Sequence, residues 1–223
     1  MLRMISANLR HGRADPAALA ELVMREEAAL VAAQELGPRQ ADALAALLPH
    51  GKLEPTADGL GLGLALARPG RVERLVLPHR SALVAELAPE AWPGLGARIE
   101  VVNLHLSAPH TRIPWSWRDR RGQVAGLLAH LAAQPLPRVL VGDFNATPRW
   151  PAYRRLAAGL DDAAVIAAAR RGAAPARTWG PHPRAPRLLR IDHALVDGLD
   201  VVDLRVVPLA GSDHSAIVVD VAG

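Results

Sequence analysis

The sequence predicts an α/β protein in which mixed β-sheets are covered by helices. Runs of apolar and β-branched residues, with the length of buried strands, recur along the whole chain. Some of these runs follow one another directly, as in hairpins, whereas others are separated by helical segments, as in crossover connections. The 223 residues are half hydrophobic and contain no linker, so we expect a single domain over residues 1–223.

The first quarter of the chain alternates strands with helices. Residues 2–8 have the apolar character of a buried strand. Residues 15–27 open on an Asp-Pro pair, which favours a helix start, and then place leucines at helical spacing. A second strand is predicted over residues 29–34, and a second amphipathic helix over residues 38–48.

Four strands in succession and one long helix are predicted next. The strands are residues 61–67, 71–77, 82–87 and 98–106, with Pro-Gly pairs at 69–70 and 93–94. The helix covers about residues 116–133 and repeats apolar side chains at the spacing of one buried face. That face consists of Val124, Leu127, Leu128 and Leu131.

The C-terminal part begins with a strand over residues 138–143 and a short helix near 151–158. A loop is expected after that helix. Three further strands, predicted over residues 191–196, 201–207 and 216–221, complete the chain.

The composition excludes several classes of protein and of site. There is no cysteine, so disulfides and thiolate metal sites are impossible, and no apolar stretch reaches the length of a membrane span. The first ten residues carry no signal-peptide pattern, which favours a cytoplasmic protein, although a removed leader stays an alternative. We expect a monomer. The net charge of +4 is too small to establish nucleic-acid binding by itself.

One strand ends in an unusual way. In "VLVGDFNATP", residues 139–148, the apolar run is followed by Asp143, Phe144 and Asn145, in a chain with only three asparagines and one phenylalanine. The two-residue period of a strand places Asp143 and Asn145 on one side and Phe144 on the other, in the core. Open α/β sheets bind ligands at such strand ends.

Other core strands also end in polar residues of the kinds that perform hydrolysis. The set contains four carboxylates, two histidines and two carboxamides. Its members are Asn8, Glu35, His105, Asp143, Asn145, Asp192, Asp213 and His214.

The segments around these residues resemble the endonuclease/exonuclease/phosphatase superfamily, which includes deoxyribonuclease I, exonuclease III, sphingomyelinases and inositol-polyphosphate 5-phosphatases. The matching segments, in order from about residue 3 to 221, are "SANLRHG", "AAQE", "VVNLHLS", "VGDFN", "RIDHALV" and "SDHSAIV". The resemblance implies a four-layer α/β/β/α sandwich with two mixed sheets face to face and helices outside. It also implies a metal-dependent phosphoesterase.

The resemblance also implies a metal site. Glu35 would be the first metal ligand, with Asn8 and Asp213 nearby. Oxygen ligands of this kind suit Mg²⁺ or Mn²⁺.

The catalytic roles follow from the same resemblance. His214 would contact the scissile phosphate or polarise water, and Asp192 would fix its tautomer. Asp143 would orient or deprotonate the attacking water, whereas Asn145 and His105 would donate hydrogen bonds to phosphate oxygens. Which of Asp143 and His214 is the base stays open.

Two arginine-rich stretches favour a nucleic-acid substrate. Residues 163–191 contain six arginines and no acidic residue, and residues 110–121, "HTRIPWSWRDRR", interleave arginines with tryptophans. The expected substrate-binding residues are Trp115, Arg118, Arg177, Arg184 and Arg187. Arg112 lies in the same stretch as Trp115 and Arg118.

We therefore expect a nuclease acting on DNA or RNA. The alternatives are a phosphodiesterase or phosphatase for a lipid or inositol headgroup and, less favoured, a non-catalytic binding module of the same fold.

Overall fold

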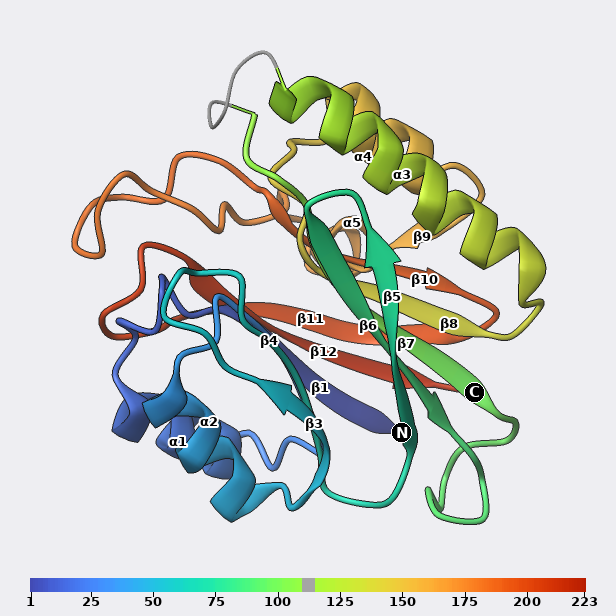
Figure 1. Cartoon of the computed structure of the whole chain (residues 1–223). Coiled ribbons are helices and arrows are strands. Elements are labelled where there is room, and N and C mark those ends of the chain that lie inside the picture. Colours follow the sequence, from blue (N-terminus) through green and yellow to red (C-terminus); the bar gives the residue numbers. More distant parts are fainter. Residues whose placement is uncertain (110–114) are drawn as a thin grey trace.

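Two mixed sheets of six strands each lie face to face in the structure, a computed structural model that describes residues 1–109 and 115–223 (Figure 1). The first sheet has, in spatial order, β11 (Asp200–Pro208), β12 (Ser215–Ala222), β1 (Leu2–Asn8), β2 (Leu30–Gln34), β4 (Leu62–Leu66) and β3 (His50–Glu54). The second sheet has β5 (Arg71–Leu77), β6 (Arg80–Leu87), β7 (Ile99–His105), β8 (Arg138–Asp143), β10 (Asp192–Asp197) and β9 (Asp161–Asp162).

Five helices accompany the sheets in the described part of the chain. They are α1 (Pro16–Arg25), α2 (Pro38–Leu47), α3 (Trp115–Ala133), α4 (Pro151–Leu156) and α5 (Ala163–Arg170). In Figure 1, α1 and α2 lie on the outer side of the first sheet, and α3 and α4 on the outer side of the second. The predicted α/β/β/α sandwich is confirmed.

Alternate residues of the central strands pack into different cores, which builds the four layers. Met4 of β1 and Val139 of β8 join the cluster between the two sheets. Their neighbours Ile5 and Leu140 face outward and pack against the helices on each side. On α3, Val124 and Leu127 of the predicted apolar face are buried, whereas Leu128 and Leu131 are only partly buried.

Two parallel strand pairs bring four strand ends to one edge of the sandwich. β1 pairs in parallel with β2, and β7 pairs in parallel with β8. The registers place Asn8 opposite Gln34 and His105 opposite Asp143. Because the carboxyl ends of parallel strands coincide, the polar residues that follow them meet at this edge.

Buried amides tie the two sheets together beneath that edge. The side chain of Asn103 on β7 donates to the backbone oxygens of Ala33 and Gly63 in the first sheet, at 3.0 and 2.8 Å. Nε2 of Gln34 donates in return to Oδ1 of Asn103 at 2.7 Å. These cross-sheet bonds fix the separation of the two sets of strand ends.

Three elements were not predicted. β3 is an edge strand whose residues are exposed or half-buried, so it lacks a hydrophobic pattern. α5 occupies residues for which a loop was expected; it starts at the cap Asp162, whose side chain accepts from Ala164 N and Val165 N. It packs against β11 and β10, which belong to different sheets. β9 is a two-residue strand immediately before it.

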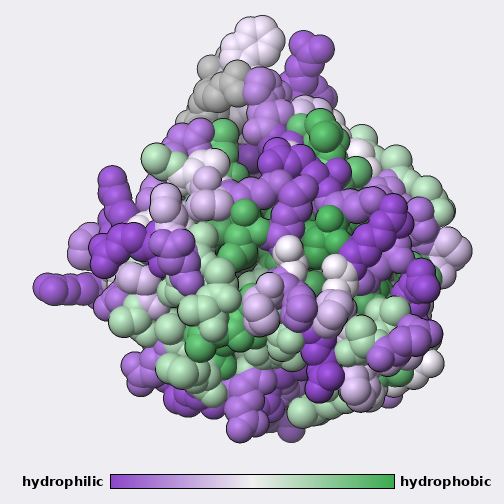
Figure 2. Space-filling model, turned by 60° about the horizontal axis from the view of Figure 1, so that its bottom comes forward, coloured by the Kyte–Doolittle hydropathy of each residue, from purple (hydrophilic) through white to green (hydrophobic). Residues whose placement is uncertain are grey.

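The surface is mixed in polarity. On the face shown in Figure 2, hydrophobic residues lie in small groups separated by hydrophilic ones. None of the helices in residues 1–109 and 115–223 combines the length and hydrophobicity that a membrane span requires.

Candidate active site

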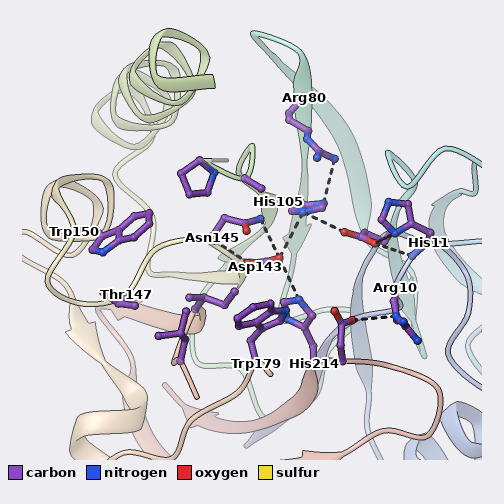
Figure 3. Close-up of a pocket in the computed structure, with 16 residues that line it drawn as sticks. Arg10, His11, Arg80, His105, Asp143, Asn145, Thr147, Trp150, Trp179 and His214 are labelled. Carbon is purple, nitrogen blue, oxygen red and sulfur yellow. Dashed lines mark hydrogen bonds and ion pairs between the residues drawn. The ribbon is translucent and has the colours of Figure 1, made fainter. Parts of the chain in front are cut away.

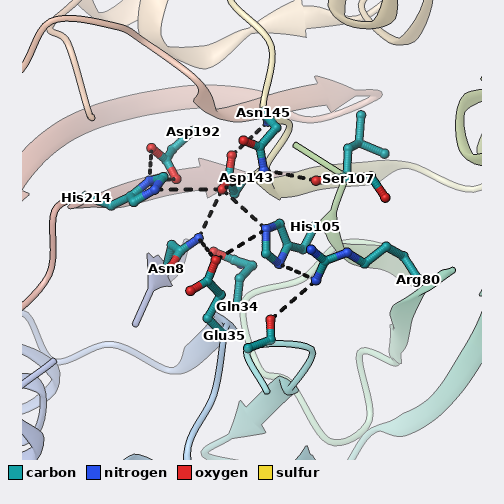
Figure 4. Close-up of polar contacts among 12 residues, drawn as sticks. Asn8, Gln34, Glu35, Arg80, His105, Ser107, Asp143, Asn145, Asp192 and His214 are labelled. Carbon is teal, nitrogen blue, oxygen red and sulfur yellow. Dashed lines mark hydrogen bonds and ion pairs between the residues drawn. The ribbon is translucent and has the colours of Figure 1, made fainter. Parts of the chain in front are cut away.

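Asp143 is the centre of the polar network at the strand ends (Figure 4). Its Oδ2 accepts hydrogen bonds from Nδ2 of Asn8 at 3.0 Å and Nδ2 of Asn145 at 3.1 Å. Its Oδ1 accepts from the backbone N–H of Asn145 at 2.7 Å. Burial raises the pKa of Asp143 to about 7; the charge of Asp192 adds to this rise and that of His214 opposes it. Burial thus favours the protonated form of this carboxyl group.

Asn145 reaches the site by a backbone turn and not by the two-residue period of a strand. β8 ends at Asp143, and Asn145 has a φ of 46°, in the left-handed region. This turn directs the Asn145 amide back to Asp143 and to the backbone oxygen of Leu106, at 3.0 Å. The prediction that both polar side chains face the site is correct, but the extended geometry given for it is wrong. Phe144 is fully buried in the outer core, as predicted.

His214 and Asp192 form a buried pair. Nδ1 of His214 lies 3.0 and 2.9 Å from the two carboxylate oxygens of Asp192. Burial alone lowers the pKa of His214, but the charges of Asp192 and Asp143 outweigh it and raise that pKa to about 9. The imidazole is therefore protonated at neutral pH. Its Nε2 lies 3.8 Å from Oδ2 of Asp143.

His105 is a neutral imidazole. Burial, together with the nearby Arg80 guanidinium, lowers the pKa of His105 well below its ordinary value. Nδ1 of His105 lies 3.3 Å from Nη1 of Arg80; a guanidinium only donates, so Nδ1 accepts and Nε2 carries the proton. Nε2 lies 3.7 Å from Oε1 of Glu35 and 3.5 Å from Oδ2 of Asp143.

Glu35 projects into the site from a strained backbone. It follows β2 directly and has a φ of 53°. Its Oε2 accepts from the backbone N–H of His11 at 2.7 Å, and Nδ1 of His11 lies 2.8 Å from the same oxygen. Its Oε1 accepts from Nδ2 of Asn8 at 3.3 Å.

The donor set around Asn8 fits a hard divalent cation. Oε1 of Glu35 and Oδ2 of Asp143 both face Nδ2 of Asn8 and Nε2 of His105, so the two carboxylates, which are of the kind that binds a hard cation, lie around these two N–H groups. In this arrangement Asn8 presents its amide N–H to the carboxylates and its Oδ1 to the backbone N–H of Arg10. To ligate a cation with Oδ1, the Asn8 side chain has to rotate so that Oδ1 takes the present position of Nδ2.

A second group of acidic and imidazole ligands lies beside the first. Ligand atoms of Asp143, Asp192 and His214 lie within 4.8 Å of one another, and all three residues are buried. The hydrogen bond between Asp192 and His214 already uses two of these ligands.

Asp213 lies apart from the other predicted metal ligands. Its Oδ1 is 3.7 Å from Nε of Arg10, and its backbone oxygen accepts from the N–H of Gly180. It lines the same pocket as Glu35 and Asp143, but in the described part of the chain no hydrogen bond or ion pair joins it to Asn8 or Glu35.

The site opens into a pocket of about 340 Å³ with two unlike walls (Figure 3). One wall carries the cationic or imidazole side chains Arg10, His11 and Arg80. The other wall carries Trp150 and Trp179, with smaller apolar residues. An anion can thus bind at the first wall while a flat or apolar group packs on the second.

Sequence reasoning missed all five of these wall residues. Arg80 begins β6, and its neighbours offer no recognisable motif. Arg10 and His11 lie within "SANLRHG", next to Asn8, so that segment was a signal. Trp179 forms isolated bridges with Leu189 and His214, which the sequence does not reveal.

None of the predicted substrate-binding residues lines this pocket. Arg177 and Arg184 are exposed, whereas Arg187 is half-buried. Arg187 donates to Ser215 Oγ at 2.9 Å and to the backbone oxygens of Ser212 and His214. It therefore braces the segment that carries His214.

The other predicted contacts lie on α3. Trp115 and Arg118 are exposed and line a separate cavity with His79 and Asp119. Arg112 lies outside the described residues. Arg177, Arg184, Trp115 and Arg118 stay predictions as remote contacts.

Comparisons with known proteins show the family and the fold of this chain. A family model described as the Endonuclease/Exonuclease/phosphatase family matches residues 5–214. No curated protein matches the sequence.

Three solved structures illustrate the shared fold. The humanized TDP2 of D. rerio is 18% identical with a TM-score of 0.76, over 100% of this chain and 99% of that one. The human Nocturnin catalytic domain with bound sulfate is 20% identical with a TM-score of 0.72, over 99% and 93%. The mannosyl-6-phosphatase of Bacteroides thetaiotaomicron VPI-5482 is 16% identical with a TM-score of 0.71, over 100% of both chains.

The family model carries the assignment, because identities this low show the fold alone. Members of this family are hydrolytic phosphoesterases that depend on divalent metal ions. Its match covers nearly the whole chain, as the sequence motifs predicted. The chain therefore belongs to the endonuclease/exonuclease/phosphatase family.

Proposed function

We propose that this protein hydrolyses phosphodiester bonds of nucleic acid with Mg²⁺ or Mn²⁺, by attack of water on phosphorus. The observation that carries the proposal is the pairing of Asp143 with His214. Asp143 is a buried carboxyl group, and His214 is an imidazole that Asp192 holds through Nδ1, so the pair can supply a base and an acid. Nε2 of His214 and Oδ2 of Asp143 lie 3.8 Å apart, close enough to address one reacting group.

Glu35 and Asn8 would hold the metal ion. Asp213 lines the same pocket but is paired with Arg10, so its part as a ligand stays a prediction. Such a cation stabilises negative charge on the phosphoryl oxygens and lowers the pKa of a bound water. The oxygen donors Glu35 and Asp143 favour a hard cation, and the absence of cysteine excludes thiolate coordination.

The side chains of the network then divide the work. Asp143 accepts the proton of the attacking water, since its carboxyl group lies at the floor of the pocket beside His214. His214, held by Asp192, donates a hydrogen bond to a phosphoryl oxygen and a proton toward the leaving oxygen. Nε2–H of His105 and the amide of Asn145 donate to the remaining phosphoryl oxygens.

The pocket walls support a nucleotide substrate. Arg10 and Arg80 neutralise phosphate charge, and Trp150 and Trp179 offer aromatic surfaces for a base. A phosphomonoesterase or phosphodiesterase for a sugar, inositol or lipid headgroup is the second candidate. The pocket of about 340 Å³ has room for one small headgroup, and the similar fold of the mannosyl-6-phosphatase accepts a sugar phosphate. A binding module without catalysis is disfavoured because every residue of the predicted catalytic set is present.

The test is a substrate panel at fixed ionic strength with Mg²⁺ and with Mn²⁺. It contains plasmid DNA, single-stranded DNA and RNA, glycerophosphoinositol and mannose 6-phosphate. We expect turnover of at least one nucleic acid, with a kcat/KM above those for the headgroups. A higher kcat/KM for a headgroup moves the second candidate to first place. No turnover of any ester contradicts both.

A further inference from the structure

We propose that the cavity between α3 and α4 binds the base and phosphate of the nucleotide next to the scissile phosphate. This inference rests on the proposed nuclease function and extends it to a second subsite. The cavity measures about 350 Å³. Its lining consists of Trp117, Arg120, Arg121, Val124, Trp150, Pro151, Ala152 and Arg155.

The cavity adjoins the catalytic pocket through one side chain. Trp150 lines both spaces, and Figure 3 shows it at the margin of the catalytic pocket, away from Arg80 and His11. A nucleic-acid strand whose scissile phosphate lies beside His214 can therefore continue past Trp150 into this cavity. Because Trp150 lines both spaces, the nucleotide that enters the cavity is the one adjacent to the scissile phosphate.

The aromatic side chains suit a nucleobase. The ring centroids of Trp117 and Trp150 are 6.3 Å apart, with the planes tilted by 32°. Trp117 is 50% exposed although it packs against another ring, so part of its indole stays open to a ligand. Stacking of bases on such rings tolerates any sequence, because every base has a π face.

The charged side chains suit a phosphate. Three arginines line the cavity, and no acidic residue is found among the described residues that line it. Arg121 and Arg155 are exposed and free to reach a backbone phosphate.

Arg120 supplies a fixed positive charge beneath them. It is buried and donates to the backbone oxygen of Ser107, and its guanidinium lies 5.9 Å from the Trp150 ring centroid. Its Nη2 has no hydrogen-bond partner among the described residues. A buried guanidinium with an unused donor favours an anion nearby.

A nucleotide accounts for this lining better than a lipid does. Most of the lining surface is apolar and includes the two indole rings, but a lipid tail has no use for the three guanidiniums that line the same cavity. Two rings and three guanidiniums match the alternation of base and phosphate along a strand.

The experiment compares a dinucleotide, a pentanucleotide and bis-4-nitrophenyl phosphate as substrates. Trp117→Ala removes one ring, and Arg155→Ala removes one exposed cation. Trp117→Phe keeps a stacking surface. Arg154→Ala is the matched control, since Arg154 is exposed on the same helix but does not line the cavity.

For the pentanucleotide, Trp117→Ala should raise KM about 5- to 150-fold, the factor that corresponds to the loss of one stacked base. The change for bis-4-nitrophenyl phosphate should be much smaller. Trp117→Phe should keep most of the pentanucleotide affinity, and Arg154→Ala should match wild type. Arg155→Ala should lower the log–log salt slope of pentanucleotide binding by about 0.7.

Two outcomes overturn the inference, and they are distinguishable. If the pentanucleotide is cleaved and Trp117→Ala leaves its KM unchanged, the subsite is wrong and the nuclease function stands. If wild type hydrolyses bis-4-nitrophenyl phosphate but neither oligonucleotide, the nuclease function fails, and the subsite fails with it.

Discussion

Nδ1 of His214 lies 2.9 Å from Oδ2 and 3.0 Å from Oδ1 of Asp192, deep in the wall of the catalytic pocket. The carboxylate both orients the imidazole and holds it in the protonated form, with a pKa of about 9. The pair therefore sets the upper end of the pH range in which His214 can act as an acid.

Asp192→Asn should lower kcat and move the alkaline limb of the pH–rate profile to lower pH. The amide removes the largest favourable charge from His214, so burial then lowers the pKa of the imidazole. We expect kcat to fall by about 10²–10⁴-fold at pH 8. Full profiles from pH 5 to 10 check this, and an unchanged alkaline limb contradicts the assigned role of Asp192.

Asn145→Gly and Asn145→Ala should separate the two contributions of Asn145. Both lose the amide that reaches Asp143 and the Leu106 oxygen, so kcat should fall by about 10²–10³-fold in both. Only alanine is strained at a φ of 46°, so it should lose about 1 kcal/mol more stability than glycine. Urea unfolding of the two variants is the measurement. Equal unfolding free energies are incompatible with the left-handed turn.

His193→Phe should flatten the loss of stability on acidification. His193 is fully buried, its Nε2 lies 2.8 Å from the Ala146 oxygen, and burial lowers its pKa to about 4. A histidine with a lowered folded-state pKa destabilises the fold as pH falls from about 6.5 to about 4, because the unfolded chain binds the proton first.

Asp143 acts in the opposite sense over much of that range, since its folded-state pKa is raised. The comparison is therefore the difference between wild type and variant, measured by urea unfolding at pH 7.5 and 4.5. This difference should change by about 2.5 kcal/mol between the two pH values. A constant difference shows that His193 is not buried in its neutral form.

The arginines of residues 163–191, the segment that contains no acidic residue, should fall into two groups. Arg177→Ala and Arg184→Ala should each lower the log–log salt slope of single-stranded nucleic-acid binding by about 0.7, if they contact remote phosphates as predicted. Arg187→Ala should instead lower stability by about 1–3 kcal/mol and slow hydrolysis of every ester, because Arg187 braces Ser212 and His214. If neither Arg177→Ala nor Arg184→Ala changes the salt slope, these two arginines do not contact remote phosphates.

Long strands with strong patterns could be predicted from the sequence, and short or polar elements could not. β8 has a continuous apolar run and β7 is rich in β-branched residues, and the predicted bounds of both strands agree with the structure to within one or two residues. β3, "HGKLE", pairs only with β4 at the sheet edge, so its residues need no hydrophobic pattern. The buried face of α5 consists of four alanines, so its hydrophobic pattern is weak. For this reason the sequence does not predict the helix, although Asp162 caps it.

The site residues that stand next to strand ends could be predicted, because the carboxyl ends of parallel strands meet. The residues that shape the pocket could not. Arg80 comes from a hairpin, and Trp150 and Trp179 from connecting segments, whose positions depend on tertiary packing. For the same reason, the sequence grouped Arg187 with exposed arginines although it braces the His214 segment.

In the proposed mechanism, Glu35 and its neighbours hold a divalent cation for phosphodiester hydrolysis at Asp143 and His214. The most direct measurement is the kcat/KM for bis-4-nitrophenyl phosphate, for wild type and Glu35→Gln, in EDTA and then with Mg²⁺ or Mn²⁺ restored. We expect no turnover by wild type in EDTA, full recovery on restoration, and a metal concentration for half-maximal rate that is at least 10-fold higher in Glu35→Gln. Circular dichroism should show the same fold for both proteins. Undiminished wild-type turnover in EDTA, or identical metal titrations for the two proteins, would contradict the claim.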